Sequence, residues 1–283
     1  MSDLVIHPYT EKQLKLFAER PSHTLLLAGP TGSGKLTLAI QLASNVLGLQ
    51  AAAFADYPYK LVVSSEDGKI GIDTIRELDG FLSLKVPRQA DYNRVVIIEN
   101  AQGLGLEAQN ALLKTLEEPP AGVLIILTVD SEQSLLPTIR SRAQSITVKR
   151  PEKAQLELFF GSQFDQNATA QAYAVSAGLP GLMKALLQEA DHPLLQATDY
   201  ARRLLSQSAY ERLLVADELS KQKQLAADVA FILQQMAHVS LQSADNARGK
   251  RWQAIMEAGY QASEALAANA QPKLAVVNLM LNL

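Results

Sequence analysis

A glycine-rich stretch near the start of the chain constrains its fold more than any other feature. The stretch fits the Gly-four-residues-Gly-Lys core of a phosphate-binding loop. The apolar run 24–28 before it reads as a buried strand, and residues 36–43 after it have the apolar spacing of a helix. In this setting the glycines let backbone N–H groups turn toward an anion, and the helix N-terminus adds partial positive charge. The predicted nucleotide-binding residues are Gly29, Pro30, Thr31, Gly32, Ser33, Gly34, Lys35, Leu36 and Thr37.

One position of this loop departs from the motif. The residue after the lysine normally carries a hydroxyl that ligates Mg²⁺, and here it is Leu36. Thr37 cannot replace it, because one residue along a helix is a rotation of about 100°. Lys35 still offers a point charge for the outer phosphates. We therefore expect a phosphate cradle without its metal ligand. The competing interpretation, a glycine-rich connector without function, is disfavoured by the strand and helix around it.

A second polar pair, Glu99 and Asn100, follows the apolar run 94–98. In parallel α/β sheets, ligands bind beyond the carboxyl ends of the strands. P-loop enzymes place a Mg²⁺-binding Asp there, often beside a Glu that prepares the attacking water. Glu99 carries its charge one methylene further out, and Asn100 cannot accept a proton. We interpret the pair as a degenerate acidic motif that supports little hydrolysis. The alternative is a strand end that happens to be polar.

Strand-like and helical patterns alternate over the first half of the chain and then give way to helices alone. This order favours a P-loop α/β domain with a parallel sheet over residues 1–150. Beyond it we expect a small helical lid over 151–195 and an all-α bundle over 196–283. The apolar stripes of this bundle are most simply its core, and the bundle could also present a face to neighbouring subunits. The expected strands are 24–28, 59–63, 94–100, 123–127 and 145–148, and the expected helices include 135–142, 152–161, 167–176, 182–189 and 273–281.

Composition excludes several function classes. The chain has no cysteine, which rules out disulfides, thiol catalysis and cysteine zinc sites. Its four histidines are far apart in sequence, so we expect no bound metal and no zinc. A net charge of −3 gives no basic bias toward nucleic acid. No apolar run reaches about 18 residues, so we expect no transmembrane helix and no membrane partner. The absence of cysteine suits a reducing cytoplasm, where we expect the protein to be located.

Five stretches of the chain together carry a family resemblance. The most specific reads NALLKTLEEPP, and the five are 22–27, 70–78, 110–120, 136–142 and 269–275. They resemble the AAA+ clamp-loader subunits of bacterial DNA polymerase III, and the resemblance covers nearly the whole chain. It implies a P-loop AAA+ domain followed by a lid and a collar.

The departures from the family pattern indicate which branch the chain resembles. Motor subunits of this family keep a full P-loop, an Asp-Glu pair and usually a four-cysteine zinc module. This chain has Leu36, Glu99-Asn100 and no cysteine. The lid turn, which normally offers an arginine, has none over 178–184, where Lys184 is at best a substitute. The chain is therefore most similar to the non-motor delta-prime branch.

The resemblance also assigns a role to Arg142. The sequence Ser141-Arg142-Ala143 stands where the family has Ser-Arg-Cys. In the family this arginine reaches into the ATP site of the next subunit, so Arg142 is the expected arginine finger, acting in trans. A surface arginine that pairs with a helix end is the structural alternative, and Arg140 is a nearby candidate for the same role.

The resemblance implies the partners. They are the delta and gamma/tau clamp-loader subunits, with the sliding clamp and primed DNA contacted through the complex. ATP or ADP is expected to bind only weakly. Two alternatives remain open: a catalytically active gamma/tau-like ATPase, and a small P-loop kinase, against which the helical second half argues.

Overall fold

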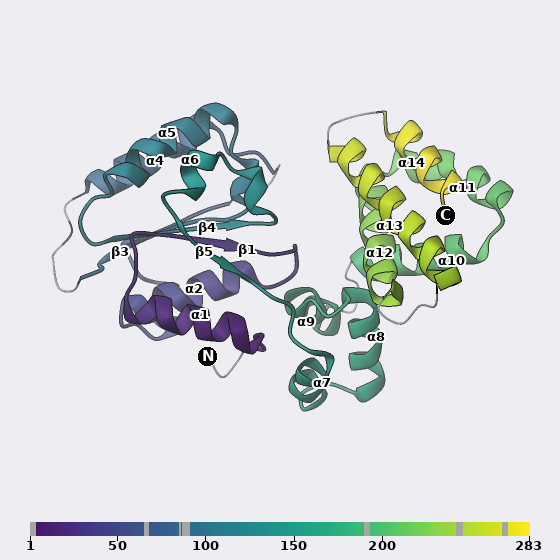
Figure 1. Cartoon of the computed structure of the whole chain (residues 1–283), viewed down its shortest axis with the longest axis horizontal. Helices are drawn as coiled ribbons and strands as arrows, with labels where there is room; N and C mark the ends of the chain where they lie inside the picture. The colour runs from purple at the N-terminus through teal and green to yellow at the C-terminus, as the bar shows by residue number, and fades with distance from the viewer. Residues whose placement is uncertain are drawn as a thin grey trace. The chain divides into compact units, whose positions relative to one another are not determined.

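The structure of the chain is a computed structural model that describes residues 4–64, 68–84, 86, 91–189, 193–241, 246–267 and 271–283. The chain forms two compact units, Met1–Pro151 and Glu152–Leu283. Figure 1 shows that strands occur in the first unit and that the described part of the second is helical. The division of the second unit into lid and collar stays a prediction.

The first unit is built on a five-stranded sheet with the order β2-β3-β4-β1-β5. Every pair of neighbouring strands is parallel. The strands are β1 (Thr24–Ala28), β2 (Lys60–Val63), β3 (Arg94–Ile98), β4 (Val123–Val129) and β5 (Gln144–Thr147). The predicted P-loop α/β fold is therefore confirmed.

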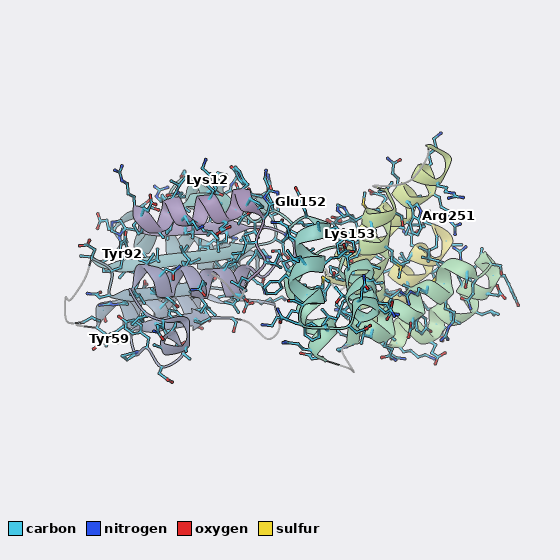
Figure 2. The ribbon with its side chains drawn as sticks, turned by 90° about the horizontal axis from the view of Figure 1, so that it is seen from below. Lys12, Tyr59, Tyr92, Glu152, Lys153 and Arg251 are labelled. Atoms are coloured by element: carbon cyan, nitrogen blue, oxygen red, sulfur yellow. The ribbon has the colours of Figure 1, made fainter. Side chains whose placement is uncertain are left out.

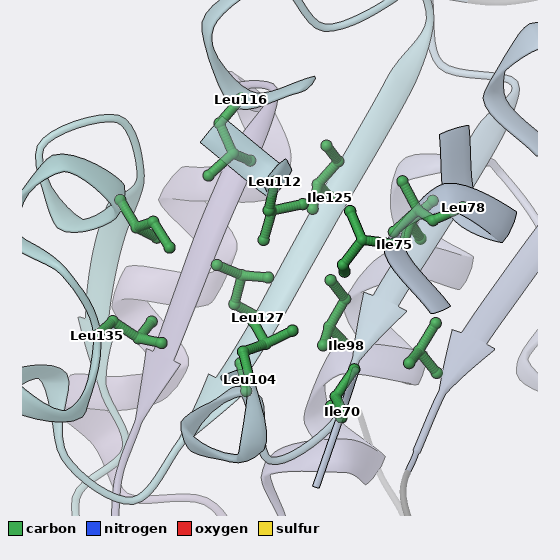
Figure 3. Close-up of a cluster of buried hydrophobic side chains, with 14 of the residues drawn as sticks. Ile70, Ile75, Leu78, Ile98, Leu104, Leu112, Leu116, Ile125, Leu127 and Leu135 are labelled. Atoms are coloured by element: carbon green, nitrogen blue, oxygen red, sulfur yellow. The ribbon is translucent and has the colours of Figure 1, made fainter. Parts of the chain in front are cut away.

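Side chains of the central strands alternate between two cores, one on each face of the sheet. In β4, Ile125 and Leu127 face one core, whereas Leu124 and Ile126 face the other. Figure 3 shows the first core, where α4 (Ile72–Ser83) and α5 (Leu106–Glu117) cover the sheet. Helices α1 (Pro8–Glu19) and α2 (Lys35–Val46) cover the second core (Figure 1). The short elements are α3 (Ala51–Phe54), η1 (Ala101–Gly103), η2 (Glu132–Ser134) and α6 (Pro137–Arg140).

Element ends differ from the sequence prediction where local contacts end a helix or a strand. The helix expected over 135–142 is shorter, α6 alone, and it begins at Pro137, the residue expected to open it. Leu136 before it is extended, the conformation that a following proline favours. At its other end, Arg142 N–H bonds the carbonyl of Ile139, and this tight turn leads into β5. Strand β4 continues two residues beyond the predicted end at 127.

Arg94 links β3 to the end of α4. Its guanidinium is buried and donates to the carbonyl oxygens of Leu82 and, at 2.7 Å, Leu84. Burial lowers the pKa of Arg94 below its usual value, because the charged form loses water. Carbonyl groups at the C-terminal end of α4 accept these bonds, so the Arg94 cation interacts favourably with the negative end of the helix dipole.

In the second unit, α7 (Lys153–Gly161) begins with a capping box. Glu152 and Gln155 each accept a hydrogen bond from the other's backbone N–H. Figure 2 labels Glu152 and Lys153 at this helix start. The Lys153 ammonium lies 5.4 Å from the ring centre of Tyr173 on α8 (Gln166–Ser176), which ties the two helices together. Helix α9 (Pro180–Gln188) begins two residues before the predicted 182, since Pro180 suits the first helical position.

Five further helices are described in the second unit. They are α10 (Pro193–Ser206), α11 (Ala209–Lys221), α12 (Lys223–Leu241), α13 (Asn246–Ala267) and α14 (Pro272–Leu281). The predicted division at 195/196 falls in the first turn of α10. Residues 269 and 270 of the family stretch 269–275 lie outside the described residues. No helix in the described ranges combines the length and the apolar character needed to cross a bilayer.

Gly259 permits close packing of α13 against α12. A Cβ atom at Gly259 would lie 2.7 Å from Cγ of Gln234 and 3.1 Å from the carbonyl oxygen of Ala230. Gln234 also donates a 2.8 Å hydrogen bond to Ser263, which fixes the pair of helices in register. The absence of a side chain at this position therefore sets the spacing of the two helices.

We predict that Gly259→Leu destabilises the second unit by about 1–3 kcal/mol, because the added side chain overpacks the contact. Gly249→Leu on the same helix is the matched control, since a Cβ atom there meets nothing within 4 Å. The control should gain up to about 1 kcal/mol of helix propensity. Urea unfolding followed by the fluorescence of Trp252 on α13 measures both. Equal midpoints for the two variants would contradict this view of the contact.

Candidate functional site

The predicted phosphate-binding loop connects β1 to α2 and has a conformation that requires glycine. Gly34 has a φ of 84°, in the left-handed region. Gly29 passes close to the strand-end backbone, because a Cβ atom there would lie 2.9 Å from the carbonyl oxygen of Val148. The loop therefore takes a tight path at the carboxyl end of β1.

The loop presents donors suited to an anion. Helix α2 starts at Gly34 without a side-chain cap, so its first N–H groups remain for a ligand. The hydroxyl of Ser33 is buried and makes no hydrogen bond in the described structure. A phosphate at this helix N-terminus would satisfy both features. The residues present thus fit a nucleotide phosphate, with Lys35 as the cation beside it.

Lys35 is held inside the loop. Its side chain is 6% exposed, and its ammonium donates to the carbonyl oxygens of Gly29 (2.6 Å) and Pro30 (3.2 Å). The third partner is Asp130, whose Oδ1 lies 2.8 Å from Nζ. A buried ammonium without such partners would be strongly destabilised. The lysine of the motif is therefore paired within its own chain.

Asp130 follows β4 directly and bridges three segments. The pairing of Ala28 with Val129 places it beside the first loop residue. Its Oδ2 accepts hydrogen bonds from the Thr31 hydroxyl (2.9 Å) and the Gln102 amide (3.0 Å). Sequence reasoning missed Asp130 because it ended this strand too early. An acidic residue immediately after an apolar strand was the signal that could have found it.

The position of the motif that normally binds Mg²⁺ is occupied by an apolar side chain. Leu36 is half-buried and packs into the core beneath α1 and α2, while Thr37 is exposed on α2. Neither offers a hydroxyl where the motif requires one. The ranges that the structure describes contain no group of three or more His, Asp or Glu side chains placed to hold a metal ion.

Glu99 and Asn100 lie at the same carboxyl edge as the loop, in the turn that follows β3. The N–H of Glu99 donates to the carbonyl of Val63, which extends the pairing of β3 with β2. Asn100 has a φ of 51°, and its N–H donates to the Thr128 hydroxyl at 3.0 Å. Asparagine tolerates this left-handed conformation better than most residues. The backbone conformation therefore accommodates Asn100, as it would an aspartate.

Arg142 lies in the turn between α6 and β5, away from these residues. Its guanidinium donates to the carbonyl of Thr138 (2.9 Å) and to the carboxylate of Glu117 at the end of α5 (2.6 Å). The side chain remains 34% exposed. In the isolated chain Arg142 therefore makes the contact expected under the structural alternative, in which a surface arginine pairs with a helix end.

The parallel sheet separates Arg142 from the chain's own phosphate loop. Thr147 pairs with Ala28 at the carboxyl end of β1, so Arg142 lies at the amino edge, before Gln144. A strand of this length spans roughly 15 Å. The structure therefore brings the loop, Glu99 and Asn100 together and places Arg142 at the opposite edge of the sheet.

Comparison with known proteins gives the family. The family described as "DNA polymerase III, delta subunit" matches residues 8–152, just over half of the chain. The chain belongs to this family. It is 32% identical to DNA polymerase III subunit delta' of Pseudomonas aeruginosa over 56% of its length and 54% of that protein. The subunit delta' of Escherichia coli is 30% identical over 69% of this chain and 65% of that protein. These relatives confirm the resemblance to delta-prime-like clamp-loader subunits.

The matches cover only part of the relatives. The chain spans about half to two thirds of the length of these delta' proteins. It also resembles subunit tau of Bacillus subtilis, with 31% identity over 52% of this chain. A DNA polymerase III gamma-subunit-related protein of Thermotoga maritima has the same fold. The two share 19% identity and a TM-score of 0.57, over 96% of this chain and 97% of that one.

The missing hydroxyl at Leu36 predicts that nucleotide binding does not depend on Mg²⁺. Calorimetric titration of the full chain with ADP should give dissociation constants in Mg²⁺ and in EDTA that agree within about threefold. Leu36→Thr restores the hydroxyl and should make ADP binding tighter in Mg²⁺. Tenfold tighter binding in Mg²⁺ by the natural chain would show that another residue holds the metal.

Proposed function

We propose that this chain is a non-motor, delta-prime-like subunit of the DNA polymerase III clamp loader. It helps to load the sliding clamp onto primed DNA by placing Arg142 in the ATP site of a neighbouring subunit. The observation that carries the proposal is the position of Arg142, which is partly exposed at the sheet edge opposite the chain's own loop.

The proposed chemistry is the stabilisation of charge in trans. Phosphoryl transfer spreads negative charge over the γ-phosphate oxygens, and a guanidinium presents a planar fork of donors that matches them. In the isolated chain the carboxylate of Glu117 occupies one side of this fork. On assembly, a neighbour's γ-phosphate would take that place, while the bond to the Thr138 carbonyl keeps the side chain directed.

The chain's own loop has a secondary role in this proposal. It holds ATP or ADP weakly through the loop backbone and Lys35. Hydrolysis there is negligible, because Leu36 supplies no metal ligand and Asn100 no base. The chain therefore contributes to ATP hydrolysis through Arg142.

Assembly is proposed to place this chain beside the gamma/tau and delta subunits in the cytoplasm, with the sliding clamp and DNA contacted through the complex. The lid, 151–195, and the collar, 196–283, would carry the subunit contacts. Exposed apolar side chains on α11 and α14 fit this role, among them Tyr210, Leu214 and Leu274. Similarity to gamma/tau and delta' relatives supports the choice of partners.

A second candidate function is a gamma/tau-like ATPase. The intact phosphate cradle and the similarity to subunit tau of Bacillus subtilis favour it. Phosphate release by the isolated chain separates the two candidates. The proposed non-motor role predicts turnover well below about 1 per second, the low end of ordinary enzyme rates. Turnover at or above that value would favour the ATPase.

We predict that Arg142→Ala leaves the reconstituted complex assembled and lowers hydrolysis at the adjacent ATP site by about 10³–10⁵-fold, the range for arginine fingers. Steady-state ATPase with clamp and primed DNA, together with a clamp-loading assay, measures the loss. Arg142→Lys should restore little, because a single ammonium lacks the fork of donors.

Arg140→Ala is the matched control for this experiment. Arg140 lies two residues away, and its Nε is buried, so it belongs to the packing of α6. Arg140→Ala should leave the ATPase rate of an assembled complex unchanged. Unchanged ATPase with Arg142→Ala would reject the proposed role of Arg142, and an equal loss with Arg140→Ala would reject its assignment to Arg142 alone.

A further inference from the structure

The phosphate-binding loop already contains an anion that belongs to the chain. The Asp130 carboxylate lies at hydrogen-bond distance from Lys35 Nζ, the Thr31 hydroxyl and the Gln102 amide. Two of these donors belong to the loop motif itself. Oδ1 takes the ammonium and Oδ2 takes the two neutral donors, so both carboxylate oxygens are used.

We propose that Asp130 is the internal counter-ion of the loop and competes with a nucleotide phosphate for Lys35. A phosphate would bring negative charge to the place where Asp130 already compensates the lysine. Binding therefore requires the Lys35–Asp130 pair to separate, or two anions to share one ammonium. Either cost weakens nucleotide binding, and this explains why the loop can keep its cradle yet hold ATP or ADP poorly. The inference deepens the weak binding assigned under the proposed function and rests on it.

The contacts favour competition over simple surface pairing. Lys35 is almost completely buried, whereas Asp130 keeps 41% of its side chain exposed. The lysine therefore depends on Asp130 for its charge balance, since its other partners are neutral carbonyl oxygens. Thr31 and Gln102 hold the carboxylate from the other side and keep it over the loop. Asp130 is thus held in place and pairs with the Lys35 ammonium, the cation that a phosphate would otherwise contact.

The isosteric variant Asp130→Asn tests this inference. The amide keeps the shape and an oxygen that can accept from Lys35, but it removes the competing charge. Calorimetric titration of the full chain with ATP, ADP and inorganic tripolyphosphate should show at least about tenfold tighter binding by the variant, equivalent to about 1.4 kcal/mol. Tripolyphosphate separates phosphate recognition from recognition of the base, and its affinity should rise as much as that of ATP.

Two further variants make the result specific. Glu132→Gln removes the same charge two residues away, where the carboxylate accepts from Ser145 and does not contact the loop. It should leave the affinities unchanged. Adding Lys35→Ala to Asp130→Asn should abolish the gain, because the released ammonium is then gone.

Thermal melting supplies a second readout in case the variant is less stable. Asp130→Asn should melt below the natural chain without ligand, and tripolyphosphate should raise its melting temperature more than that of the natural chain. Equal or weaker phosphate binding by Asp130→Asn, or the same gain with Glu132→Gln, would overturn the inference. If Arg142→Ala still lowered the ATPase of the complex in that case, the proposed function would be retained and only this inference rejected. If Asp130→Asn bound phosphate more tightly but Arg142→Ala left the ATPase unchanged, only the proposed function would be rejected.

Discussion

The parallel direction of the strands is the constraint on which the rest of the first unit depends. Because β1 and β5 run the same way, the loop that follows β1 and the turn that precedes β5 must lie at opposite edges of the sheet. The chain therefore separates a phosphate cradle at one edge from Arg142 at the other. We propose that an arginine so placed serves a nucleotide on a neighbouring molecule, since the chain's own loop lies at the opposite edge.

The buried charge of Lys35 determines how the cradle is arranged. A lysine this deeply buried needs a counter-charge, and the strand order supplies one by placing the residue after β4 beside the loop. Where Mg²⁺ chemistry would need a hydroxyl and an acid, the chain has Leu36 in the core and Asn100 in a left-handed turn.

Patterns that are local in sequence predicted most of the fold. The apolar strands, the glycine loop and the proline at the start of α14 are each specified by neighbouring residues, and all are found. Thr74 illustrates the limit of such reasoning. Thr74-Ile75-Arg76-Glu77 has the residue pattern of a capping box, which would begin a helix just after Thr74. Helix α4 instead begins at Ile72 after Gly71, so Thr74 lies within the helix.

The contacts of Asp130 could not be predicted in this way. They depend on the register of β1 with β4, and residues almost a hundred positions apart are brought together only by that pairing. The pairing of Arg142 with Glu117 likewise depends on tertiary structure, because it requires the contact between α5 and the α6 segment. Sequence identified Arg142 through a family pattern and placed it before the last strand of a parallel sheet. The structure adds the register of β5 with β1 and the contact with Glu117.

The central claim is that this chain contributes to ATP hydrolysis through Arg142 and not through its own loop. The most direct measurement is the ATPase rate of an assembled complex in which only Lys35 of this chain is changed to Met. That substitution removes the phosphate-binding charge while keeping an unbranched side chain only one atom shorter in the buried position. We predict a rate equal to that of the unmodified complex in the presence of clamp and primed DNA. A fall equivalent to the loss of one hydrolysing subunit would contradict it, because it would show that the chain's own loop turns over ATP.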